Sequence, residues 1–144
     1  MIIIRATDDE VDVSGSSYEL QQVRAAIRRF AACSDPVRNI PADATADPTP
    51  YQFALRELRL LRTGERTRVS ISNQMSLVVS GPAENLRKFS SWFAFSPDAP
   101  AGSHNHFERL PGDPYVAEDA VPLLISVEAQ QSVQPDRRED AAPG

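Results

Sequence analysis

A short pattern of apolar residues, Ser-Gly and a helix-like segment occurs twice in this chain, at a constant offset of 66 positions from Gly15 to Gly81. Val11–Gly15 is the first copy and Leu77–Gly81 is the second. In the first, apolar residues at alternate positions predict a strand with one buried face, and the glycine permits a sharp turn. Apolar residues then follow at three- and four-residue spacing, which predicts a helix. The sequence therefore predicts two similar strand–Ser-Gly–helix units.

Both helices carry start signals and an apolar stripe. Ser16 and Glu19 have the spacing of a capping box, and Pro82 follows Gly81 at a position typical of a first helical turn. Pro97 is expected to end the second helix. The stripes consist of Leu20, Val23, Ile27 and Phe30 in the first unit and of Leu86, Phe89 and Phe93, with Trp92 beside them, in the second.

Further strands are expected around the two units. Alternation predicts strands at residues 2–4, 69–72, 104–110 and 122–128, and residues 58–62 are expected to form a hairpin with residues 66–72. Residues 51–58 fit either a strand or a helix, and strand is preferred. The predicted fold is α+β, with a largely antiparallel sheet and two helices on one of its faces.

The chain of 144 residues is expected to form one domain over residues 1–128. Residues 129–144 are almost free of apolar side chains after Val133, so a disordered tail is predicted. Prolines gather in residues 36–50 and 97–122, where irregular connections are expected. The single cysteine, Cys33, excludes an internal disulfide and is expected to be a buried thiol.

Charge and hydropathy narrow the class of protein. The net charge of −5 argues against general binding to nucleic acid, which requires a basic surface. No stretch approaches the roughly 20 apolar residues of a membrane span, and no signal peptide is recognisable. A cytoplasmic protein that binds neither membrane nor nucleic acid is expected. Ser14 and Ser80 lack the surroundings of a catalytic elbow, and no glycine-rich phosphate loop or other cofactor motif is present.

One group of residues has the chemistry of a metal site. His104, His106 and Glu108 alternate, so on a strand all three side chains would lie on one face. Two histidines and a carboxylate can bind iron or zinc with coordination positions left open. The same side chains also fit a solvated or capping role on the strand surface.

The segment 98–128 is acidic and rich in proline. It carries six carboxylates against the single cation Arg109, and aromatic residues lie among these charges. Loops that expose aromatic side chains among acidic groups are credible protein-binding surfaces, although a solvated loop is the alternative. The candidate partner-binding residues are Phe107, Glu108, Asp113, Tyr115, Glu118 and Asp119.

The second half of the chain, from about Leu58 to Glu128, resembles the bacterial immunity proteins of polymorphic toxin systems, in the group called immunity protein 32. The residues that carry the resemblance are Leu77–Gly81 with Leu86 and Phe89, Ser103–Glu108, Pro111–Tyr115 and Val121–Ile125. The resemblance implies an α+β protein that binds and neutralises a cognate toxin without catalysis of its own. It also implies that His104, His106 and Glu108 are polar residues typical of the group. The alternative hypothesis is a small metal-dependent enzyme that uses these three residues. The sequence leaves the toxin's identity and the oligomeric state open.

Overall fold

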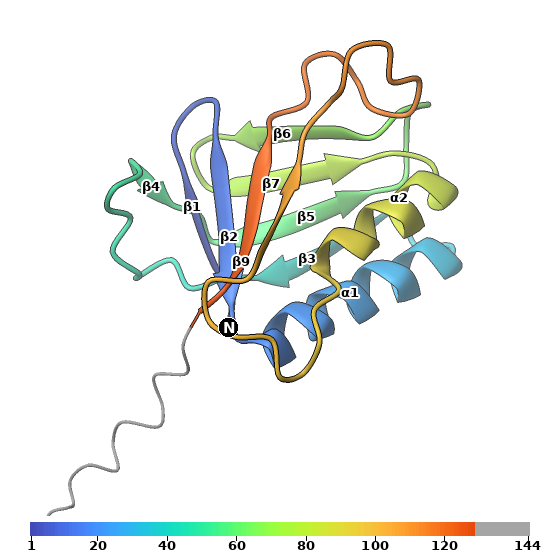
Figure 1. Ribbon diagram of the computed structural model, residues 1–144. Helices are drawn as coiled ribbons and strands as arrows, with labels where there is room; N and C mark the ends of the chain where they lie inside the picture. The colour runs from blue at the N-terminus through green and yellow to red at the C-terminus, as the bar shows by residue number, and fades with distance from the viewer. Residues whose placement is uncertain (129–144) are drawn as a thin grey trace, which may run out of the picture.

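The computed structural model describes residues 1–128, which form two helices and nine strands arranged in two sheets (Figure 1). The predicted tail, residues 129–144, lies outside the described residues. The α+β class and the packing of two helices against sheet are confirmed. The strands, however, divide between two sheets of mixed direction where a single sheet was expected.

The first sheet has five strands. In order across the sheet they are β4 (Phe53–Ala54), β1 (Ile3–Ala6), β2 (Val11–Gly15), β9 (Leu123–Val127) and β8 (His104–Phe107). Strands β2 and β9 run parallel, and the other neighbours are antiparallel. Because side chains alternate along a strand, one face of this sheet is apolar and fully buried, as at Ile4, Val13 and Ile125.

The second sheet has four strands. In order they are β3 (Val37–Pro41), β5 (Glu57–Leu61), β7 (Ser76–Ser80) and β6 (Arg68–Ser72). Here β5 and β7 run parallel, and the outer pairs are antiparallel. Leu58, Leu60, Leu77 and Val79 have no exposed surface and turn into the same core as the apolar face of the first sheet.

The two helices begin where the sequence predicts. Helix α1 (Ser17–Ala32) has the complete capping box, because Ser16 Oγ accepts from the Glu19 amide at 3.1 Å and the Ser16 amide donates to Glu19 Oε1 at 2.9 Å. Helix α2 (Ala83–Ser90) follows Pro82 and continues into a 3-10 turn, η1 (Ser91–Phe93). The second helical segment thus ends at Phe93, before the predicted limit at Pro97.

The helices lie side by side, run in opposite directions and cover the sheets from one side (Figure 1). The predicted stripes are buried against the sheets and against each other: Leu20, Ile27, Leu86 and Phe93 have no exposed surface, and Phe89 retains 2%. Burial of large apolar side chains on this scale is the main source of stability. The helix pair therefore forms the centre of a core that spans both sheets.

The predicted repeat is present. It is longer than the two strand–Ser-Gly–helix units, because further strands in each half also correspond. The two halves share a hairpin, a helix and two further strands: β1, β2, α1, β3 and β5 in the first, and β6, β7, α2, β8 and β9 in the second. The short strand β4 of the first half has no equivalent in the second. After each helix the chain crosses to the other half's sheet, where β5 pairs with β7 and β9 pairs with β2. Each sheet thus combines the hairpin of one half with two strands that follow the helix of the other half, and β4 adds a short edge strand to the first sheet.

The strand registers support this reciprocal exchange. Equivalent central residues have equivalent neighbours: Val13 lies between Ile4 and Ile125, and Val79 lies between Val69 and Leu60. Each of these residues is buried with no exposed surface. The two halves therefore share one packing scheme, and they are related by an approximate two-fold arrangement in which the helices contact each other.

Three expectations were wrong in detail. Residues 58–62 do not form a hairpin with 66–72, because β7 lies between β5 and β6 in the sheet. The proline-rich stretch contains strand β3, which pairs with β5 through its backbone and was not predicted. Cys33 is exposed, because the C-terminal end of α1 extends past the core. Residues 51–58 contain strand β4 and the start of β5, as preferred.

Candidate partner-binding site

The two halves differ most in the connections that follow β3 and β8. Each connection makes one isolated parallel bridge to the start of a hairpin, Ile2 with Ala42 in the first half and Thr67 with Val116 in the second. Ala42 follows β3 directly, whereas residues 108–115 lie between β8 and Val116. Residues 108–115, called the insert below, therefore precede the bridge in the second half, whereas the first half has the longer part of its connection, residues 43–56, after the bridge.

The insert has a defined conformation that follows from its sequence. The Asp113 amide donates to Leu110 O at 3.0 Å, with Pro111 and Gly112 between them and Gly112 at φ 80°. Proline followed by a residue of positive φ is the arrangement of a type II turn, for which glycine is the preferred residue. Asp113 Oδ1 then accepts from the Tyr115 amide at 2.8 Å. The turn thus spans residues 110–113, with Pro111 and Gly112 at its two central positions.

Two hydrogen bonds attach the end of the insert to the scaffold, and a third joins its start to the residue that follows it. Tyr115 O accepts from the Thr67 amide at 2.8 Å and from Asn85 Nδ2 at 3.3 Å, and Arg109 Nε donates to Val116 O at 3.2 Å. The insert is thus tied both to the start of β6 and to α2. Such attachment reduces the conformational entropy that a loop loses on binding a partner.

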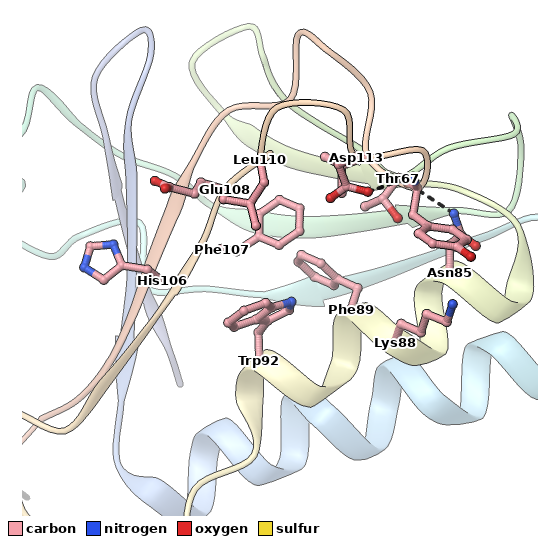
Figure 2. Close-up of a pocket in the computed structure, with 12 residues that line it drawn as sticks. Thr67, Asn85, Lys88, Phe89, Trp92, His106, Phe107, Glu108, Leu110 and Asp113 are labelled. Carbon is pink, nitrogen blue, oxygen red and sulfur yellow. Dashed lines mark hydrogen bonds between the residues drawn. The ribbon is translucent and has the colours of Figure 1, made fainter.

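The insert forms one wall of a cavity of about 370 Å³ between α2 and β8 (Figure 2). Its floor is aromatic: Phe107 makes edge-to-face contacts with Phe89 at 5.2 Å and with Trp92 at 6.0 Å between ring centroids. Figure 2 shows these three side chains turned toward one another. Phe107, predicted to contact a partner, is 4% exposed and instead supports the cavity from below.

The other end of the cavity is polar. Thr67 and Asn85 line it and are only 4% and 8% exposed, and Asp113 lies beside them (Figure 2). At the opening, the Lys88 ammonium nitrogen lies 4.1 Å from the centroid of the Tyr115 ring, a cation–π contact. The cavity therefore combines aromatic walls with a few polar groups, which is the usual composition of a binding pocket.

Two apolar side chains of the insert face solvent next to this cavity. Tyr115 is 54% exposed and Leu110 is 60% exposed, although the backbone on both sides of them is held in turns. Tyrosine is among the residues that contribute most to protein–protein binding. The predicted residues Tyr115, Asp113 and Glu108 thus meet at one site, with Leu110 as an unpredicted member.

Glu118 and Asp119 lie beyond the insert and outside the cavity. Asp119 Oδ1 accepts from Arg68 Nε at 3.1 Å, and Glu118 is 4.0 Å from Arg109. Both carboxylates remain largely exposed, so these pairs contribute little to stability and leave the negative charge accessible to solvent.

The side-chain geometry gives no support to the metal hypothesis. His104 and His106 project from the same face of β8 with ring centroids 5.5 Å apart, and His104 Nδ1 is 3.1 Å from Gly102 O. In Figure 2, His106 and Glu108 extend away from the aromatic floor. Within residues 1–128, no three His, Cys, Asp or Glu side chains are arranged to hold a metal ion.

The first half has a smaller hollow of about 240 Å³ at the equivalent place, lined by Ile2, Val23 and Ile40 among others. The position equivalent to Asn85 is Glu19, whose carboxylate is already bound to the Ser16 amide and to the amino group of Met1. The insert has no counterpart here. The two halves thus differ at the candidate site, where Asn85 stands in place of Glu19 and the insert is present.

A second polar cluster lies on the outer face of the first sheet. Asp12 is 9% exposed, accepts from Ser126 Oγ at 3.2 Å and lies 3.7 Å from Arg5, which also approaches Glu128 at 3.5 Å. Burial raises the pKa of the Asp12 carboxyl above its ordinary value, while Ser126 and Arg5 act in the opposite direction and the charge of Glu128 adds to the rise. The carboxyl is therefore harder to ionise in the folded chain.

Comparison of the chain with protein-family models, with curated proteins and with solved structures finds no match. Neither helix described in residues 1–128 is long and apolar enough to cross a membrane.

Proposed function

We propose that this chain is a non-enzymatic binding protein whose insert binds a partner protein, and that the partner is a bacterial toxin which the chain neutralises as an immunity protein. The observation that carries the binding role is the exposure of Tyr115 and Leu110 on a loop that hydrogen bonds fix to α2 and β6. A rigid loop with apolar side chains beside a cavity has the elements of an interface centre.

Charge supports a basic partner. Residues 98–128 carry a local balance of −5, and Glu118 and Asp119, just beyond the insert, hold part of this charge on exposed side chains. A patch of one charge accelerates association with a partner of the opposite charge. The assignment of that partner as a toxin comes from the resemblance of Ser103–Glu108 and Pro111–Tyr115 to immunity proteins, and the second of these segments lies within the insert.

The test is co-expression of the chain with a toxin encoded by an adjacent gene. Growth should be rescued, and the two proteins should co-purify as a complex of defined stoichiometry on size-exclusion chromatography. The variant Tyr115→Ala should lose rescue, whereas Tyr18→Ala, which removes an equally exposed tyrosine from α1, should retain it. Absence of both rescue and complex would refute the immunity assignment.

A further inference from the structure

We propose that the cavity beneath the insert receives one arginine side chain of the partner. The inference rests on the proposed function, since it names the group through which that partner would be recognised. The cavity of about 370 Å³ lies near the lower end of the roughly 300–1,000 Å³ typical of ligand pockets. It is suited to one large side chain and too small for a packed helix or strand.

The buried polar groups favour an occupant that donates hydrogen bonds, because the Asn85 amide oxygen only accepts and the Thr67 hydroxyl can also accept. Asn85 donates through Nδ2 to Tyr115 O, and both Asn85 and Thr67 line the cavity, so that Asn85 Oδ1 and Thr67 Oγ1 are the polar atoms left for an occupant. No group within residues 1–128 donates to either oxygen, and neither oxygen is sealed from solvent. Buried polar side chains are normally hydrogen-bonded, so an apolar occupant would leave these two acceptors without a partner.

Charge then selects a cationic donor. Asp113 lies at the same end as Thr67 and Asn85, and Glu108 lies at the edge of the cavity (Figure 2). Across the described part of the chain, neither the Asp113 nor the Glu108 carboxylate has a cationic group within 4.0 Å. The Lys88 ammonium contacts the Tyr115 ring instead. Two carboxylates against one ammonium favour a cation and disfavour a carboxylate or phosphate ligand.

The aromatic walls of the cavity favour an arginine side chain over a lysine side chain. Trp92 and Phe107 offer aromatic surface to a flat, weakly hydrated guanidinium, which stacks on such rings better than an ammonium does. Its five N–H groups can also reach acceptors that are spread over Thr67, Asn85 and Asp113, whereas lysine is a compact charge with three donors. The aliphatic stem of arginine would contact the remaining apolar wall.

The experiment is a titration of the isotope-labelled full chain with N-acetyl-arginine methylamide, monitored by NMR. Saturable shifts are expected at the Asn85 side-chain amide, the Trp92 indole and the Thr67 amide. The matching lysine, leucine and glutamate derivatives are the competing occupants, and each should bind at least about tenfold more weakly, the ratio that one lost charge-assisted hydrogen bond produces. Equal binding of leucine, tighter binding of glutamate, or no saturable shift with arginine would overturn the inference.

Two conservative variants keep the test independent of folding. Thr67→Val exchanges only the hydroxyl for a methyl group and leaves the backbone bridge to Val116, and Asp113→Asn retains an oxygen that can accept from the Tyr115 amide. Each should weaken arginine binding by about tenfold with an otherwise unchanged spectrum. Unaltered affinity in both would also contradict the proposal. Because no toxin is present, this titration fails or succeeds separately from the rescue assay.

Discussion

The side-chain amide of Asn85 donates a hydrogen bond to the carbonyl oxygen of Tyr115 across 3.3 Å, and so connects α2 to the insert. The equivalent position in the first half, Glu19, caps α1 instead. The same helical position thus serves the helix in one half and the neighbouring loop in the other. Several properties of the insert depend on this attachment and on its own turn residues.

Gly112→Ala should reduce both stability and partner binding. Gly112 has φ 80°, where a Cβ costs about 1 kcal/mol, while the space around it within residues 1–128 is open. Gly102→Ala is the matched control, because Gly102 has φ 96° and equally open surroundings for an added methyl group, but it lies outside the insert. Urea unfolding should show similar losses in both variants, and calorimetry should show weaker binding only for Gly112→Ala. Equal affinities would contradict the role of the turn.

The repeat predicts matched contributions from its two helices. Leu20 and Leu86 occupy equivalent positions without exposed surface, so Leu20→Ala and Leu86→Ala should each lower the free energy of unfolding by about 2–5 kcal/mol. Leu110→Ala, at a site 60% exposed, should change it by no more than about 0.5 kcal/mol. Chemical denaturation measures all three, and a small loss at either helix would show that the two halves do not share one core.

Local features of the fold were predictable from the sequence, whereas the pairing of strands within the two sheets was not. The capping box at Ser16 and Glu19 and the alternation at Val11 and Val13 are encoded within a few residues, so the sequence alone reveals both. Strand β3 escapes prediction because it is an edge strand with mostly exposed side chains, held by its backbone pairing with β5. The parallel pairing of β5 with β7 depends on the exchange of strands between halves, for which no local signal exists.

The candidate site was predictable only in part, because some of its residues lie together in the sequence and others meet only in the tertiary fold. Asp113 and Tyr115 belong to one distinctive acidic segment, so composition and turn residues drew attention to them. Thr67, Asn85 and Trp92 come from other elements, and only the tertiary fold brings them to the cavity. Phe107 was expected on an exposed surface but is buried beneath the cavity, because composition does not show which face of β8 turns inward.

Asp12→Asn should stabilise the protein at neutral pH. Because burial raises the pKa of Asp12 above 3.8, the folded chain binds this proton more tightly than the unfolded chain does. The contribution of Asp12 to stability is therefore largest below pH 3.8 and falls as the pH rises through the folded-state pKa. Urea midpoints from about pH 3 to about pH 7 should show a gain for Asp12→Asn that disappears on acidification. Asp8→Asn, at an exposed loop position, is the control, and a gain that is independent of pH would contradict this origin.

The exposed carboxylates beyond the insert should act on the rate of association. Glu118→Lys combined with Asp119→Lys reverses charge near the proposed interface, so association with a basic partner should slow by up to about tenfold at low salt, with little change in dissociation. Stopped-flow binding at several salt concentrations measures this effect. Asp8→Lys combined with Asp9→Lys makes the same net change in the turn between β1 and β2, and a comparable slowing there would indicate a net-charge effect without a local patch.

The affinity of the purified chain for its cognate toxin, measured by calorimetry for Tyr115→Ala and Tyr18→Ala, tests the proposed interface most directly. The two tyrosines are 54% and 68% exposed, so neither substitution should alter folding appreciably. If the insert is the centre of the interface, Tyr115→Ala should cost about 2 kcal/mol of binding, roughly thirtyfold in Kd, and Tyr18→Ala should leave Kd unchanged. Unchanged affinity for Tyr115→Ala, or an equal loss for Tyr18→Ala, would contradict the assignment of the insert as the partner-binding surface.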